Sequence, residues 1–206
     1  MAGQTGAAGL LAQLSEDLAR AVELAGQAVV AVKARRRIPG SGVLWTPPGV
    51  VVTADHVLER EEDILVTTAD GRELPAAVVG RDPSTDLAVL RVAANGLAPA
   101  VLGDPATVRV GHFVLALGRA APGAPSASVG IVSAIGGPWR SRRGVAVEGY
   151  LRTDLTLYPG FSGGPLVDAL GRVIGINTSL LAQGQGMALP LPTVQRVVEA
   201  LLTQGR

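Results

Sequence analysis

The chain has 206 residues, of which 48% are apolar and only 3% aromatic, so Val, Leu, Ile and Ala must form its core. A formal net charge of +1 gives no long-range field that would attract nucleic acid or an anionic membrane, and neither is expected as a partner. The absence of cysteine excludes disulfides and thiolate chemistry, and two histidines supply a zinc site poorly, so no metal is expected.

The first predicted element is an amphipathic helix at residues 10–25. Its apolar positions recur at helical spacing and are Leu11, Leu14, Leu18, Ala21, Val22 and Ala25. No basic residue precedes Arg20, which is not typical of a signal peptide. No segment approaches the roughly 18–20 consecutive apolar residues of a membrane-spanning helix. As written, the chain is expected to be cytoplasmic, and exported only if a leader was removed.

From Ala28 onward, short β-branched runs bounded by Gly and Pro predict two sets of six strands. The first set is Ala28–Val32, Gly42–Trp45, Val50–Thr53, Ile64–Thr68, Leu74–Val79 and Leu87–Val92. The second set is Phe113–Leu117, Ala127–Ala134, Val145–Leu151, Gly164–Val167, Arg172–Ser179 and Met187–Pro190. We expect a mainly β protein with a helical segment at 1–26 and one domain at 27–206. This domain divides into a barrel at about 27–110, a second at about 111–190 and a terminal helix at about 191–204.

The segment 160–166, Gly-Phe-Ser-Gly-Gly-Pro-Leu, places Ser162 among small residues. Flanking glycines let the backbone approach a substrate carbonyl closely, so the turn Gly160, Phe161 and Ser162 is predicted to form an oxyanion hole. The amides of Gly160 and Ser162 are its expected donors. The alternative is an ordinary β-turn that happens to contain a serine, because short motifs misfire.

Two further residues can activate such a serine. His56 ends the strongly β run 50–53, and a neutral imidazole can take the serine proton and return it to a leaving amine. Asp86 begins an apolar strand 30 residues later, where its carboxylate can orient the imidazole and stabilise the imidazolium. Taken singly, His56 can be structural and Asp86 a turn cap. Together with Ser162 they predict a catalytic triad.

Several linked motifs resemble the HtrA/Deg family of serine proteases from about Ala28 to Leu202. They are the runs 40–43 (GSGV), 51–57 (VVTADHV), 85–90 (TDLAVL), 152–154 (RTD), 159–166 (PGFSGGPL) and 171–177 (GRVIGIN). The order His, Asp, Ser contradicts the α/β-hydrolase order. The resemblance implies a chymotrypsin/trypsin-like double β-barrel without a cofactor, cleavage of unfolded or damaged proteins in quality control, and a homotrimer.

The chain also departs from the family pattern, which usually has Asn before the nucleophile and Ala before the histidine. Phe161 and Asp55 occupy these positions and could disturb the oxyanion turn or the charge near His56. A second hypothesis is therefore a catalytically silent, protease-like barrel that acts as a peptide-binding or chaperone module.

The specificity pocket is predicted from the alignment around Ser162. Thr156 stands six residues before the nucleophile, where trypsin-like enzymes that select basic side chains carry a carboxylate. Leu157 and Met187 offer apolar surface. Burying an unpaired ammonium or guanidinium would cost several kcal/mol. We therefore expect Val, Ala, Leu or Ile before the cleaved bond.

Overall fold

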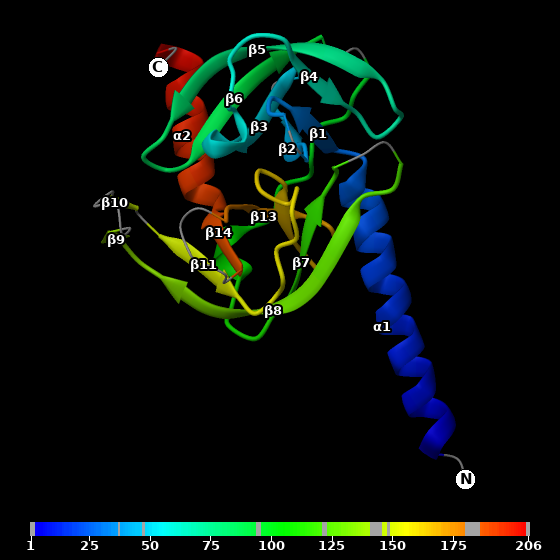
Figure 1. Cartoon of the computed structure of the whole chain (residues 1–206). Helices are drawn as coiled ribbons and strands as arrows, with labels where there is room; N and C mark the ends of the chain where they lie inside the picture. Colours follow the sequence, from blue (N-terminus) through cyan, green and yellow to red (C-terminus); the bar gives the residue numbers. More distant parts are fainter. Residues whose placement is uncertain are drawn as a thin grey trace.

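The computed structural model describes residues 3–36, 38–46, 48–93, 96–120, 123–140, 146–147, 149–179 and 186–204. Two closed six-stranded barrels lie one above the other, with a helix at each end of the chain (Figure 1). All strand pairs within the barrels are antiparallel. This architecture confirms the predicted mainly β double barrel with N-terminal and C-terminal helices.

The first barrel closes in the order β1-β2-β3-β6-β5-β4. Its strands are β1 (Val29–Lys33), β2 (Gly40–Trp45), β3 (Val50–Ala54), β4 (Ile64–Thr67), β5 (Glu73–Asp82) and β6 (Leu87–Val92). β-branched and leucine side chains fill its interior, as the composition predicts for a core with few rings. β5 runs three residues beyond the predicted strand, to Asp82, and there pairs with Leu87 of β6.

The second barrel closes in the order β11-β14-β13-β12-β7-β8. Its strands are β7 (Phe113–Gly118), β8 (Ser126–Gly136), β11 (Tyr150–Thr153), β12 (Pro165–Asp168), β13 (Val173–Asn177) and β14 (Gly186–Pro190). The sequence did not predict the two-stranded sheet of β9 (Trp139–Arg140) and β10 (Ala146–Val147). Val145, where one predicted strand begins, lies outside the described residues.

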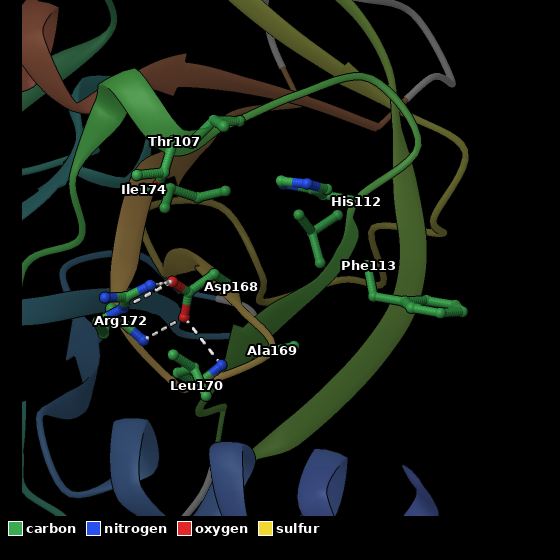
Figure 2. A pocket seen from close by; sticks show the side chains of 10 residues that line it. Thr107, His112, Phe113, Asp168, Ala169, Leu170, Arg172 and Ile174 are labelled. Atoms are coloured by element: carbon green, nitrogen blue, oxygen red, sulfur yellow. Dashed lines mark hydrogen bonds and ion pairs between the residues drawn. The ribbon is translucent and has the colours of Figure 1, made fainter. Parts of the chain in front are cut away.

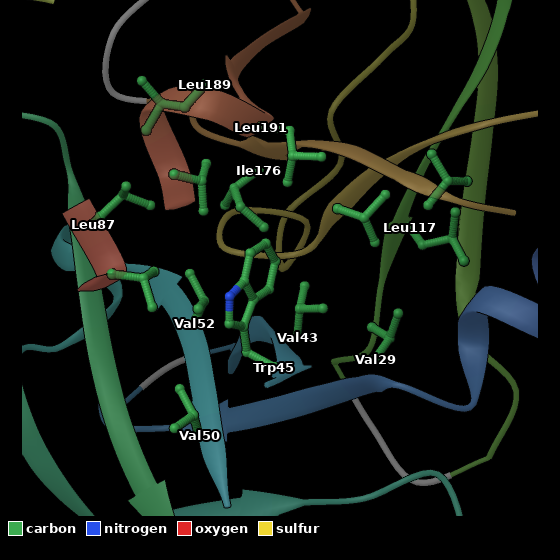
Figure 3. Packing of buried hydrophobic residues seen from close by; sticks show 14 of the residues in the cluster. Val29, Val43, Trp45, Val50, Val52, Leu87, Leu117, Ile176, Leu189 and Leu191 are labelled. Atoms are coloured by element: carbon green, nitrogen blue, oxygen red, sulfur yellow. The ribbon is translucent and has the colours of Figure 1, made fainter. Parts of the chain in front are cut away.

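The largest core cluster lies between the barrels rather than inside either one. Trp45 of β2 sits at its centre, with its indole among Val43, Val52, Leu117 and Ile176 (Figure 3). Because Leu117 and Ile176 belong to the second barrel, burial of this apolar surface holds the two barrels together. A site built from residues of both barrels therefore has a rigid base.

The terminal helices cover this junction to different extents. α2 (Leu191–Gln204) packs on β5, β6, β13 and β14, so it touches both barrels. α1 (Gly3–Gly26) begins seven residues before the predicted start, and only its second half packs on the barrels (Figure 1). Ala21 is buried, whereas Leu10 and Leu11 are 74% and 69% exposed. Neither helix, within the described residues, combines the length and apolar character needed to cross a membrane.

Candidate active site

His56 lies in a short 3-10 helix, η1 (Asp55–Val57), directly after β3. The neighbouring Val57 is buried and anchors this turn in the first barrel. Gly40 of β2 leaves room for Val57, because a Cβ atom at Gly40 would lie 2.4 Å from Val57 Cγ1. The turn also closes on itself, since the Leu58 amide donates to Asp55 O at 3.0 Å. The imidazole is therefore carried on a fixed backbone.

Arg81 of β5 clamps the same turn from outside. Its Nε donates to Asp55 Oδ1 at 2.6 Å, and its Nη2 donates to the carbonyls of Asp55 and Leu58 at 3.3 and 3.1 Å. The Asp55 carboxylate is the main cause of a raised pKa of the Arg81 guanidinium. The charge of Asp55 is thus paired with Arg81. Asp55 departs from the family pattern, and its ion pair with Arg81 supports the His56 turn.

Asp86 lies in the turn between β5 and β6 and has φ = 59°, a left-handed conformation that Asp tolerates better than most residues. Its side chain is buried and bonded on both oxygens. His56 Nδ1 lies 2.9 Å from Oδ1 and 2.8 Å from Oδ2, and the His56 amide donates to Oδ1 at 3.0 Å. Thr178 Oγ1 donates to Oδ2. Since an ionised carboxylate only accepts, Nδ1 carries the imidazole proton and Nε2 is free to act as a base.

Ser162 lies in the turn between β11 and β12, so the second barrel carries this residue of the predicted triad. Gly163 has φ = 84°, and a Cβ atom there would lie 2.2 Å from Ser41 O. The turn is tied to β13 because the Gly163 amide donates to Asn177 O at 2.9 Å. Asn177 Nδ2 also donates to Pro165 O at 2.8 Å. The positive φ of Gly163 and the lack of space for a Cβ atom explain why glycine follows the serine.

Ser41 of β2 joins the serine turn to the first barrel. Its amide donates to Ser162 O at 2.9 Å, and its Oγ donates to Gly160 O at 2.6 Å. The Arg119 amide in turn donates to Ser41 Oγ at 2.8 Å. Ser41 is fully buried, so these bonds do not compete with water. The position of the oxyanion turn therefore depends on a hydroxyl from the other barrel.

The three residues predicted for the oxyanion hole differ in their hydrogen bonding. The Phe161 amide donates to Tyr158 O at 3.0 Å, which closes the turn and removes this amide as a free donor. Within the described part of the chain, the amides of Gly160 and Ser162 have no hydrogen-bond partner. Gly160 has φ = 96°, a conformation that favours glycine. The two free donors are the pair that the sequence pointed to, and Phe161 contributes through the turn.

The side chain of Phe161 is buried in the core of the second barrel, with 2% of its surface exposed. It makes an edge-to-face contact with Tyr158, with ring centroids 5.7 Å apart. Gly118 of β7 makes room for it, because a Cβ atom there would lie 2.6 Å from Phe161 Cδ1. The aromatic ring therefore supports the serine turn from inside the barrel.

Ser162 and His56 are brought into one network through a third residue. Ser162 Oγ lies 2.9 Å from Ser179 Oγ, which lies 3.5 Å from His56 Nε2. Among the described residues, no hydrogen bond joins Ser162 Oγ directly to the imidazole. The sequence did not single out Ser179, and its only signal was its position two residues after the end of the buried strand β13.

The residues predicted for the specificity pocket lie on two segments of the second barrel. Thr156 is exposed and Leu157 half-buried on the segment after β11, whereas Met187 is buried in β14. Met187 O accepts from the Thr178 amide at 3.0 Å, so β14 lies beside the strand that leads to the triad. Leu155 is the buried residue of the first segment, and a Cβ atom at Gly186 would lie 2.8 Å from its carbonyl oxygen. The sequence did not relate Leu155 or Gly186 to the predicted pocket.

A pocket of about 320 Å³ opens elsewhere on the second barrel, beside β7 (Figure 2). His112 and Phe113 line one side, and Leu170 and Arg172 line the other. Asp168 accepts hydrogen bonds from Arg172 Nε at 2.7 Å and from the Leu170 amide at 2.9 Å, so its charge is already paired. No residue of the predicted triad lines this pocket.

Comparison with known proteins identifies a peptidase family to which this chain is similar. The family model described as the trypsin-like peptidase domain matches residues 40–176. A probable DegP-like periplasmic serine endoprotease of Chlamydia pneumoniae is 34% identical over 180 residues, which are 84% of this chain and 36% of that protein. The serine protease HhoB of Synechocystis is 38% identical over 178 residues, 84% of this chain and 42% of that protein.

Solved structures give the same result in three dimensions. The HtrA-type protease AlgW with a decapeptide superposes with a TM-score of 0.78 at 32% identity, covering 91% of this chain and 68% of that one. The serine endoprotease from Yersinia pestis gives a TM-score of 0.77 at 36% identity, with 92% and 68% covered. The chain spans about two fifths of the length of the curated relatives described above.

Proposed function

The chain belongs to the trypsin-like peptidases of the HtrA type, and we propose that it is a serine endopeptidase that hydrolyses peptide bonds in unfolded or damaged proteins. The observation that carries the proposal is the buried Asp86 carboxylate, held by His56 Nδ1 and Thr178 at the junction of the barrels. This contact leaves His56 Nε2 as a base directed toward the serine turn. The identity to proteins named serine proteases supports the same activity.

In the proposed reaction, Ser162 Oγ attacks the carbonyl carbon of the cleaved peptide bond. The serine proton passes to His56 Nε2, and the carbonyl oxygen becomes an oxyanion bound by the Gly160 and Ser162 amides. Collapse of the tetrahedral intermediate breaks the C–N bond, and the imidazolium gives its proton to the leaving amine. Water then hydrolyses the acyl-enzyme with His56 as the base, which regenerates Ser162.

The activity is tested by cleavage of unfolded casein by the purified chain, with Ser162→Ala as the matched control. We expect the wild-type chain to release peptides and the variant to release none. Absence of cleavage by the wild-type chain would favour a silent, peptide-binding barrel. Phe161 and Asp55 motivated that alternative, but one packs inside the barrel and the other pairs with Arg81.

The same digest tests the proposed specificity. We propose an apolar pocket involving Thr156, Leu157 and Met187, because no carboxylate stands at the Thr156 position. Covering an aliphatic side chain contributes about 25 cal/mol per Å². Mass spectrometry of the peptides should therefore find Val, Ala, Leu or Ile before the cuts. Cuts that follow mainly Lys or Arg would contradict an apolar pocket but would not contradict the proposed triad.

The natural substrates are proposed to be unfolded or damaged polypeptides. Solved relatives are named as complexes with a decapeptide or a tripeptide, and this supports a peptide-binding cleft here. Several relatives are named periplasmic, which supports an exported location rather than the cytoplasmic one expected from the sequence.

We further propose a homotrimer in which α1 takes part. Leu10, Leu11 and Leu14 are exposed on the half of the helix that extends beyond the barrels (Figure 1). Light scattering should find a trimer for the wild-type chain and a monomer for Leu10→Glu/Leu11→Glu. The control Ser15→Glu adds a charge to an exposed position of the same helix and should leave the mass unchanged.

A further inference from the structure

Arg119 directly follows β7 of the second barrel, and it is a buried arginine that takes no part in the proposed reaction. Only 2% of its surface is exposed. Its guanidinium donates to three main-chain carbonyls, from Nη2 to Gly26 O at 2.9 Å, from Nε to Val29 O at 2.7 Å and from Nη1 to Gly123 O. Burial lowers the pKa of the guanidinium, because the charged form is costly away from water. These hydrogen bonds offset that cost and fix the side chain.

Two of the carbonyls that Arg119 binds lie where α1 leads into β1. Gly26 is the last residue of α1, and Val29 is the first residue of β1. The last carbonyls of a helix have no partner within the helix, and a cation is stabilised beside them. Arg119 therefore caps the C-terminal end of α1 and joins this end to the first strand of the neighbouring barrel.

The main chain of Arg119 leads from this junction to the oxyanion turn. The Arg119 amide donates to Ser41 Oγ at 2.8 Å, and the same hydroxyl donates to Gly160 O at 2.6 Å. Gly160 has φ = 96° and no Cβ atom, so its own conformation is weakly restricted. The hydrogen bond at its carbonyl fixes one of the two peptide planes that meet at Gly160. The other plane carries the N–H that is proposed as an oxyanion donor, and its rotation is limited in turn.

We propose that Arg119 is a positioning residue, which acts through Ser41 to hold the Gly160 donor of the oxyanion hole in place. This inference rests on the proposed function. The side chain anchors the residue to α1 and β1, and the amide orients the Ser41 hydroxyl. Because Ser41 Oγ accepts from this amide, its own proton is directed at Gly160 O. The Gly160 amide then points toward the oxyanion before the charge develops, and such preorganised donors need no rearrangement during the reaction.

Acylation by p-nitrophenyl acetate, read as the burst of nitrophenolate, tests this role without dependence on the specificity pocket. Arg119→Met removes the guanidinium and keeps an unbranched side chain. We expect it to lower the limiting acylation rate about tenfold or more and to leave the half-saturating ester concentration within about twofold. An interaction made mainly in the transition state gives this split. Arg91 of β6 is exposed, and the matched control Arg91→Met should stay within about twofold in both quantities.

A double variant distinguishes positioning through Ser41 from a general loss of structure. Ser41→Ala removes the hydroxyl that connects Arg119 to Gly160, so adding Arg119→Met should then have little further effect. We expect the double variant to acylate within about threefold of Ser41→Ala, whereas independent effects would multiply to a further loss of about tenfold. Circular dichroism checks that each variant is folded. If Arg119→Met does not fold, Arg119→Lys takes its place in both comparisons and should lower the acylation rate at least about threefold.

Two results would overturn the positioning role while the protease proposal stands. One is a folded Arg119 variant that acylates within about twofold of wild type. The other is a set of single losses that multiply in the double variant, because Arg119 would then act independently of Ser41. A wild-type chain that shows no Ser162-dependent burst, with Ser162→Ala as the reference, would instead overturn the proposed function and the positioning role with it.

Discussion

Thr178 donates a hydrogen bond from Oγ1 to the Oδ2 atom of Asp86, although the two residues lie in different barrels and 92 positions apart. A hydrogen bond to a charged group is worth about 1.5–3 kcal/mol. We expect Thr178→Val, which keeps the shape and removes the donor, to lower kcat/KM for a peptide substrate about tenfold. Thr178→Ser keeps the donor and should retain most of the activity. Equal activity of the two variants would show that the hydroxyl does not support the triad.

Loss of the Arg81 contacts with the His56 turn should lower the activity less than loss of the Thr178 hydroxyl. Arg81→Gln removes the ion pair with Asp55 and weakens the bonds to two carbonyls of the turn. We expect kcat to fall a few-fold because His56 is held less firmly, and the free energy of unfolding to fall by about 1–2 kcal/mol. Arg72→Gln disrupts the exposed pair with Asp70 and should change neither quantity, since solvent screens an exposed ion pair. Similar losses in both variants would mean that the clamp has no special role.

Alanine substitutions at Gly163 and Gly111 distinguish the cost of a steric collision from the cost of backbone strain alone. Both have positive φ, but only at Gly163 would an added Cβ atom lie within 3 Å of main-chain atoms, namely Ser41 O and Ala54 N. Gly111→Ala should therefore cost only about 1–2 kcal/mol of unfolding free energy, the strain of a left-handed residue. Gly163→Ala should cost more than about 4 kcal/mol or prevent folding. Urea denaturation compares the two, and equal midpoints would contradict the described packing of the serine turn.

The buried ring of Phe161 predicts a structural role for the residue before the nucleophile. Phe161→Ala should lower the free energy of unfolding by about 3–5 kcal/mol, as for other buried phenylalanines, and should reduce kcat by loosening the oxyanion turn. Phe113, the other phenylalanine, is 46% exposed, and Phe113→Ala should have a small effect on stability. Thermal unfolding of both variants measures the difference. A stable and fully active Phe161→Ala would show that the ring does not position the turn.

The strands and the two barrels could be predicted because β-branched runs, bounded by Gly and Pro, repeat six times in each half of the chain. The separation of His56, Asp86 and Ser162 into the two halves was visible for the same reason. The N-terminal extension of α1 was not, because residues 3–9 contain three glycines and lack an apolar stripe. Propagation from the helical residues that follow outweighs weak propensity there.

The residues that connect the site could not be found from the sequence. Ser41, Thr178 and Ser179 are single hydroxyls at strand ends or in strands, and nothing in their spacing relates them to the triad. Their roles arise from contacts across 119, 92 and 17 positions, which only the fold brings together. The burial of Phe161 could not be predicted either, because its ring fills a space left by Gly118 on another strand.

Activation of Ser162 as a nucleophile by His56 is tested most directly by labelling with a serine-directed fluorophosphonate and mapping the adduct by mass spectrometry. We predict one covalent adduct per wild-type chain, located on Ser162. Ser162→Ala should carry none, and His56→Ala should react at least about 10³-fold more slowly because the base is lost. A folded wild-type chain that remains unlabelled, or an adduct on another residue, would contradict this role of Ser162.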